Sequence, residues 1–64
     1  MILNGKLIEF KDSITIKELL QDYDLDYKKV VVEVNEEIIL KEDYYKFILK
    51  ENDKIEVISF VGGG

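Results

Sequence analysis

The 64-residue chain contains no cysteine, histidine, arginine, proline or tryptophan. Without cysteine or histidine, the sequence provides no disulfide, no thiolate or imidazole metal ligand, and neither a cysteine nucleophile nor a histidine base. Without arginine, it lacks the guanidinium group that forms bidentate hydrogen bonds with phosphate groups and guanine. These absences exclude most enzyme chemistries, so we expect a protein that is not a catalyst. The lack of cysteine is also compatible with a reducing cytoplasm, where we expect the protein to reside.

Long hydrophobic runs and an excess of positive charge are absent too. No apolar run exceeds three residues, so we expect neither a membrane span nor a signal peptide. Nine lysines against fourteen acidic residues give a formal charge of −5, which favours a basic protein surface as partner and argues against nucleic acid. With 47% apolar residues the chain is too hydrophobic to be disordered, and its length allows one small domain without a deep pocket.

The first ten residues have the pattern of a β-hairpin. Asn4-Gly5 accepts the positive φ angles of a type I′ turn and stands between two short apolar segments. Because side chains alternate along a strand, the pattern predicts one inward-facing set and one outward-facing pair. The inward set is Met1, Leu3, Ile8 and Phe10, and the outward pair is Ile2 and Leu7.

A helix is predicted to begin after Thr15. Thr15 and Glu18 form a capping-box pattern, in which each side chain can bond a free backbone N–H of the first turn. We expect the helix to end at Tyr23 or Asp24, because the aspartates on either side of Leu25 offer competing hydrogen bonds, and we expect Leu25 to reach into the core. The apolar residues at the spacing of one helix face are Ile16, Leu19, Leu20 and Tyr23.

The second half of the chain is typical of further strands and turns. A β-branched run is followed by Glu36 and Glu37 and then by a second apolar segment, and a longer apolar strand comes last, with Ile55 and Val57 facing inward. The predicted elements are strands over 30–35, 38–40 and 55–61, a short helical turn over 43–49, and a tight turn over 50–53.

This order of elements predicts an α+β fold with a mixed sheet of four to five strands packed on one main helix. The β-grasp, or ubiquitin-like, fold is the architecture that accommodates such a sheet and helix in a chain of this size. We assign residues 1–61 to the β-grasp domain and residues 62–64 to a flexible glycine tail.

Three groups of side chains partly match the pattern of a functional site, and we interpret all three as structural. Four acids have the spacing of a calcium-binding loop, but Tyr27 stands where that loop needs glycine, so we expect no metal site. These acids are Asp22, Asp24, Asp26 and Glu33. Two further acidic pairs lack the cleft that a carboxylate acid and base require, and three aromatic residues are expected to pack under the sheet edge. They are Glu36-Glu37, Glu42-Asp43, and Tyr44, Tyr45 and Phe47.

The C-terminus is the most informative segment. Three of the four glycines, Gly62, Gly63 and Gly64, end the chain directly after an apolar strand end. Lacking Cβ atoms, they can thread a channel too narrow for other residues and deliver the Gly64 carboxylate into another protein's active site. An ionised carboxylate is a poor electrophile, so its activation requires a partner that uses ATP. Beside the tail we predict a docking surface of exposed apolar residues, formed by Ile58 and Phe60 and joined by Ile2 and Leu7.

Over nearly its full length the sequence resembles the ThiS family, sulfur carrier proteins within the MoaD/ThiS-like ubiquitin-like superfamily. Among the departures, Glu36 stands where that family commonly has glycine. The matching landmarks are Asn4-Gly5, Thr15-Ile16 with Leu19-Leu20, Val32-Glu33-Val34-Asn35, Tyr44, Leu49-Lys50, Asp53-Lys54-Ile55-Glu56-Val57, and Val61-Gly62-Gly63-Gly64.

The resemblance implies a function in thiamine biosynthesis. An E1-like enzyme, ThiF, would adenylate the Gly64 carboxylate with Mg-ATP, and sulfur from a persulfide donor protein would displace AMP to leave a thiocarboxylate. Thiazole synthase, ThiG, would then consume that sulfur. The chain itself would bind no cofactor and would be a monomer when free. Two alternatives stay open: a MoaD-like sulfur carrier of molybdopterin biosynthesis, and a ubiquitin-like interaction module or modifier whose terminus joins a lysine.

Overall fold

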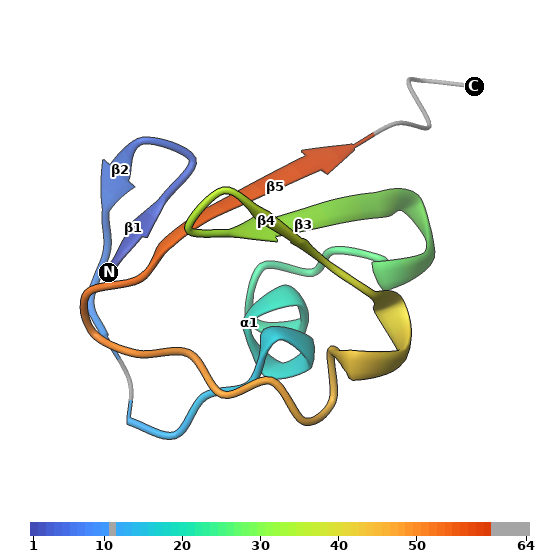
Figure 1. The fold of residues 1–64 in the computed structure, drawn as a ribbon, viewed down its shortest axis with the longest axis horizontal. Helices are drawn as coiled ribbons and strands as arrows, with labels where there is room; N and C mark the ends of the chain where they lie inside the picture. Colours follow the sequence, from blue (N-terminus) through green and yellow to red (C-terminus); the bar gives the residue numbers. More distant parts are fainter. Residues whose placement is uncertain (11, 60–64) are drawn as a thin grey trace.

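The computed structural model describes residues 1–10 and 12–59, and within them a five-stranded mixed sheet packs on the helix α1 (Figure 1). The strand order is β2-β1-β5-β3-β4; β1 and β5 run parallel in the middle, and the other neighbours are antiparallel. This arrangement confirms the predicted α+β, β-grasp class. The strands are β1 (Ile2–Leu3), β2 (Lys6–Leu7), β3 (Val30–Val34), β4 (Glu37–Ile39) and β5 (Lys54–Ser59), and the helix α1 is Ile16–Asp22.

The opening hairpin has the predicted turn and the predicted faces. Asn4 and Gly5 have φ angles of 50° and 83°, as a type I′ turn requires. Met1 and Leu3 are buried, and Ile8 and Phe10 pack against the core. Ile2 and Leu7 are paired with each other on the opposite, exposed face. The alternation read from the sequence is therefore confirmed.

Helix α1 begins with the predicted capping box. Thr15 Oγ1 accepts a hydrogen bond from the Glu18 N–H at 3.1 Å, and Glu18 Oε1 accepts one from the Thr15 N–H at 2.8 Å. The helix ends at Asp22, and Tyr23 serves as its C-cap. The expectation that Leu25 reaches into the core is wrong, since this side chain is exposed. Asp24, with a φ of 56°, turns the chain before Leu25 and brings it out of the helical path.

The turn between β3 and β4 lies one residue earlier than its predicted position. Asn35 and Glu36 have φ angles of 52° and 72°, so β3 ends at Val34 and β4 begins at Glu37. Glu36 thus occupies a left-handed conformation that glycine adopts without strain. The Asn35 side chain fixes this register, because its Nδ2 donates to Asp53 Oδ1 at 2.9 Å and its Oδ1 accepts from the Lys54 N–H at 3.0 Å.

Two short 3₁₀ turns complete the described chain. The turn η2 (Lys41–Asp43) starts two residues before the predicted helical turn. The turn η1 (Tyr27–Lys29) was not predicted, although its cap uses the side-chain bonding expected of the aspartates here: Asp26 Oδ1 accepts from the Lys28 N–H at 2.9 Å. In the described ranges no helix is both long and apolar enough to cross a lipid bilayer.

The core lies between the sheet and α1. Tyr44 is buried and Phe47 packs on the core, as predicted, but the prediction for Tyr45 is wrong, because this side chain is 65% exposed. The buried core residues are Met1, Leu3, Ile14, Ile16, Leu19, Leu20, Val30, Val32, Val34, Tyr44, Leu49 and Ile55. Burial of Ile55 and of alternate valines of β3 holds β5 firmly in the centre of the sheet.

Candidate functional site

Strand β5 carries the chain to the glycine tail. It pairs with β3 along its whole length after Lys54, from Ile55 opposite Val34 to Ser59 opposite Val30. Its start is held by the Asn35 contacts described above. Four of the predicted site residues, Phe60, Gly62, Gly63 and Gly64, lie outside the described residues, so their predicted roles remain predictions. In the sequence, the glycines begin three residues after Ser59, the last residue of the central strand β5.

The outer face of the sheet near the end of β5 is apolar. Ile58 is 46% exposed and lies directly opposite the half-buried Val31 of β3. Leu40 and Ile38 are also exposed, and the strand alternation places them on this same face. A shallow hollow of about 480 Å³ includes Val31, Ile38 and Leu40 in its lining. The sequence analysis missed these three residues, although the alternation of β3 and of the 38–40 segment pointed to them.

Ile2 and Leu7 occupy a different part of the outer face. Ile2 lies opposite Lys54, which is four residues before Ile58 on β5. Four residues of a strand span roughly 13 Å. The Glu56 side chain lies between them on the same face. The structure therefore brings Ile2 and Leu7 together with each other, and it places them beside the start of β5 while Ile58 lies near its end.

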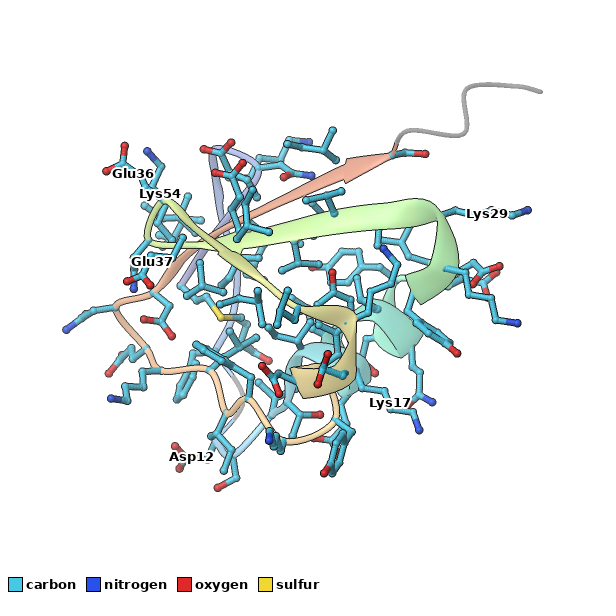
Figure 2. The ribbon with its side chains drawn as sticks, turned by 45° about the vertical axis from the view of Figure 1, so that its right-hand side comes forward. Asp12, Lys17, Lys29, Glu36, Glu37 and Lys54 are labelled. Carbon is cyan, nitrogen blue, oxygen red and sulfur yellow. The ribbon has the colours of Figure 1, made fainter. Side chains whose placement is uncertain are left out.

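Charges differ between the two ends of the sheet. Figure 2 shows Glu36, Glu37 and Lys54 gathered where β5 begins, and Lys29 at the other end, beside the start of β3. Between these ends, Glu33 and Glu56 face each other across β3 and β5, and both are half-buried. Like charges in such directly opposed positions destabilise a sheet. The outer face therefore has an acidic centre bordered by the apolar patch around Ile58.

The edge of β3 beyond β4 is covered by two side chains from the segment after β4. Tyr44 Oη accepts a hydrogen bond from the Val32 N–H at 3.2 Å, and Lys41 Nζ donates to the Val30 carbonyl at 3.0 Å. Burial raises the pKa of the Tyr44 phenol, and the hydrogen bond from Val32 partly offsets that rise. We refer to this stretch, Val30–Val32 on the β4 side, as the closed edge.

The acidic residues with calcium-loop spacing serve structural roles or lie apart. Asp26 caps η1, Asp24 adopts a left-handed turn conformation, and Glu33 belongs to β3. Across residues 1–10 and 12–59, no three acidic side chains gather into a group able to hold a metal ion.

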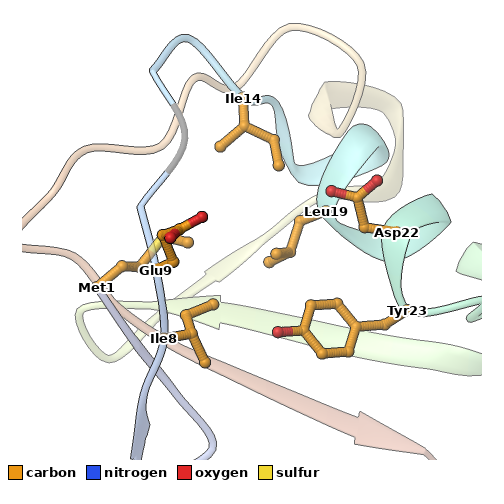
Figure 3. A pocket seen from close by; sticks show the side chains of 7 residues that line it. All are labelled: Met1, Ile8, Glu9, Ile14, Leu19, Asp22 and Tyr23. Atoms are coloured by element: carbon orange, nitrogen blue, oxygen red, sulfur yellow. The ribbon is translucent and has the colours of Figure 1, made fainter.

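A cavity of about 250 Å³ lies between the hairpin and α1 (Figure 3). Its wall combines the carboxylates of Glu9 and Asp22 and the ring of Tyr23 with four apolar side chains. These are Met1, Ile8, Ile14 and Leu19. Tyr23 was predicted to join the apolar face of the helix; it lies at the helix end and is 47% exposed. Its lining includes the core residues Met1 and Leu19, so the cavity lies on the helix side of the sheet, whereas Ile58 belongs to the outer face.

The chain matches the model of the ThiS family over residues 1–64. It is 51% identical to the sulfur carrier protein ThiS of Bacillus subtilis over 63 residues, which cover 97% of this chain and 96% of the relative. The crystal structure of the thiamine biosynthesis protein ThiS of Geobacter metallireducens superposes with a TM-score of 0.80 at 30% identity, covering 98% of this chain and 96% of that one.

A larger protein contains a similar segment. The chain is 38% identical over its full length to the thiazole synthase of Paramagnetospirillum magneticum, of which it covers 20%. That thiazole synthase therefore includes, within one polypeptide, a segment similar to this entire chain.

Proposed function

Because the chain belongs to the ThiS family, we propose that it carries sulfur on its C-terminal glycine for the synthesis of the thiamine thiazole. The protein is a sulfur carrier of thiamine biosynthesis and not a catalyst. The observation that carries the proposal is the full-length match to a sulfur carrier, on a fold whose central strand leads directly into Gly62-Gly63-Gly64.

The chemistry proceeds at the Gly64 carboxylate. Its pKa is about 3.5 in an unperturbed chain end, so it is ionised and must be activated before a sulfur nucleophile can attack it. An E1-like, ThiF-type enzyme joins the carboxylate to AMP by consuming Mg-ATP and releasing pyrophosphate. The terminal sulfur of a persulfide on a donor protein then attacks the acyl carbon and displaces AMP, which gives an acyl disulfide between carrier and donor. A thiol reductant then cleaves the S–S bond of this disulfide and releases the thiocarboxylate. In this proposal ATP and Mg²⁺ are bound by the partner, and the reaction takes place in the cytoplasm, where ATP is supplied.

The consumer of the sulfur is a thiazole synthase of the ThiG type. The thiazole synthase that contains a segment similar to this chain supports this assignment, since fusion keeps two cooperating units in one polypeptide. The same relative favours the thiamine pathway over the MoaD-like alternative, because its name assigns it to thiazole synthesis.

Docking of the partners uses the apolar outer face around Ile58, with Phe60 next to the tail. Val31 and Leu40 extend that face beside Ile58 and enlarge the apolar area. Ile2 and Leu7 were predicted to join the docking surface; because they lie beside the start of β5, we propose that they contact the partner only at the margin of that surface. Replacing Ile58 with Asp should weaken adenylation more than the same change at Leu7.

Intact mass measurement after reaction tests the proposal. The purified chain is incubated with the activating enzyme of its host, Mg-ATP and the persulfide donor. We expect a C-terminal fragment heavier by one oxygen-to-sulfur exchange, and no such product from a variant that lacks Gly64. A product linked to lysine would assign the chain to the modifier class, and an unchanged mass with a competent enzyme would contradict the proposed function.

A further inference from the structure

Strand β5 has an unpaired edge over its second half. On the hairpin side, β1 pairs only with Lys54 and Ile55. Within the described ranges no strand accompanies Glu56–Ser59 on that side, although β3 continues along the other side as far as Ser59. Figure 1 shows β5 running on beyond the hairpin towards the C-terminus. We refer to Glu56–Ser59 on the hairpin side as the open edge.

The hydrogen bonds of the hairpin show which backbone groups point to this side. Ile55 C=O accepts from the Asn4 N–H at 2.9 Å, and the Val57 N–H donates to Asn4 Oδ1 at 2.8 Å. Both groups of a strand residue point to the same side, and successive residues alternate. The Val57 carbonyl and the Ser59 N–H are therefore directed to the open edge, while Glu56 and Ile58 use their backbone groups towards β3.

Proteins usually protect such an edge. Common devices are lysine or proline in the strand, a bulge, or a covering segment. The closed edge of β3 uses covering side chains, since Tyr44 and Lys41 bond its free backbone groups. The open edge contains neither lysine nor proline, and it has the β-prone sequence Glu56-Val57-Ile58-Ser59. It thus retains the donors and acceptors with which a further strand can pair.

The side chains beside the open edge indicate what kind of strand fits. On the outer face, Glu56 already faces the carboxylate of Glu33, and a cation on a third strand would relieve this like-charge pair. Two residues further, Ile58 is exposed next to Val31 and offers an apolar neighbour. A complementary strand therefore has a lysine or arginine beside Glu56 and an apolar residue beside Ile58.

We propose that the open edge, Glu56–Ser59, accepts an extended segment of the activating enzyme as an additional strand of the sheet. The inference rests on the proposed function and specifies how that enzyme holds the carrier. Gly64 is five residues further along the chain than Ser59, and five residues span at most roughly 17 Å when extended. A strand bonded at Ser59 thereby fixes the origin of the tail at a set distance from the site where the carboxylate reacts.

Replacing Ser59 with proline tests the backbone pairing. Ser59→Pro removes the N–H that points to the open edge, and it leaves the ladder with β3 intact because that ladder uses Glu56 and Ile58. Ser59→Ala, which keeps the N–H, is the matched control. We expect kcat/KM for adenylation by the host activating enzyme to fall about three- to tenfold for Ser59→Pro and to remain unchanged for Ser59→Ala. Equal rates for the two variants would overturn the proposal.

The charge preference has its own pair of variants. Glu56→Gln should reduce kcat/KM for adenylation about threefold or more and weaken its dependence on salt, because Glu56 borders the added strand. Glu33→Gln removes a carboxylate from the same row on the side away from the open edge, and it should have a smaller effect. A larger effect at Glu33 than at Glu56 would contradict the proposed position of the partner's cation.

Amide hydrogen exchange separates this inference from the proposed function. Addition of the activating enzyme without ATP should slow exchange of the Ser59 N–H, whether or not the terminus later reacts. Protection without adenylation would refute the sulfur-carrier chemistry and retain the added strand. Adenylation without protection of the Ser59 N–H would refute the added strand and retain the sulfur-carrier chemistry. Protection that rises with the concentration of the carrier alone would show self-association through this edge and would overturn the choice of partner.

Discussion

Two strand edges of the same sheet differ in whether side chains cover their free backbone groups. At the closed edge, Val30–Val32, side chains bond the backbone on the β4 side. The Val32 N–H donates to Tyr44, and the Val30 carbonyl accepts from Lys41. At the open edge, Glu56–Ser59, the hairpin contributes only the Asn4 side chain, which bonds Val57. The closed edge includes two residues with buried side chains, Val30 and Val32. The open edge, by contrast, ends at Ser59, which is close in sequence to the glycine tail.

The difference follows from what each edge must do. An unsatisfied backbone group near the core costs free energy of folding, so covering the closed edge stabilises the domain. Under the proposal, the backbone groups of the open edge must remain without a covering side chain, because a strand of the partner is to bond them. Substitutions at the closed edge should therefore lower the free energy of unfolding and leave the rate of adenylation unchanged. Substitutions in the glycine tail should lower the rate of adenylation and leave the free energy of unfolding unchanged.

The largest expected effect lies beyond the open edge, in the tail. Gly63→Val adds a branched side chain to a segment that, in the proposed function, threads a narrow channel. Misplacement of the reacting carboxylate by about 1 Å can cost a hundredfold in rate. We expect adenylation by the activating enzyme to fall at least about a hundredfold, with an unchanged midpoint of urea unfolding. Glu51→Gln, in an exposed turn, is the control for both measurements. Normal adenylation of Gly63→Val would refute the threading model.

The next effect is at the closed edge. Tyr44→Phe removes the phenol oxygen and leaves the buried Val32 N–H without its acceptor. We expect a loss of about 1–3 kcal/mol in the free energy of unfolding, measured by urea titration, and an unchanged rate of adenylation. Tyr45→Phe removes the same atom from an exposed ring and should be neutral. If both variants were equally stable, the covering role of Tyr44 would be disproved.

A smaller effect is expected at the second covering residue. Lys41→Met keeps the aliphatic stem and removes the donor to the Val30 carbonyl. Since this contact is only partly buried, the expected loss is about 0.5–1 kcal/mol in the same titration. Lys46→Met, which removes the donor of the exposed 3.2 Å ion pair with Asp43, is the control and should show less change. A larger loss for Lys46→Met would contradict the ranking.

The smallest effect concerns pH. Burial raises the Tyr44 pKa above its ordinary value of 10.0, so above that pH the folded state retains a proton that the unfolded state releases. The stabilisation by Tyr44 is therefore complete below pH 10 and is lost as the pH rises through the folded-state pKa. Urea titrations at pH 8 and pH 10.5 should show a larger decline for the parent chain than for Tyr44→Phe. Identical declines would exclude this linkage.

Local patterns were sufficient for much of the fold. Asn4-Gly5 determined the first turn, and Thr15 with Glu18 determined the start of α1, because both signals act within a few residues. The alternation of valines identified the buried face of β3 for the same reason. The register of the β3–β4 turn was missed by one residue, since it depends on the Asn35 contacts with Asp53 and Lys54, eighteen and nineteen residues away.

The sequence by itself determined the class of fold, the inward faces, the exposure of Ile58 and the family, because periodicity, capping and a terminal glycine run are written in adjacent residues. Only the tertiary structure decided at which residue the pairing between two neighbouring strands ends. Strand β1 meets β5 from the other end of the chain, and Tyr44 reaches Val32 across twelve residues. Such contacts depend on the lengths and directions of several elements at once, which no local pattern specifies.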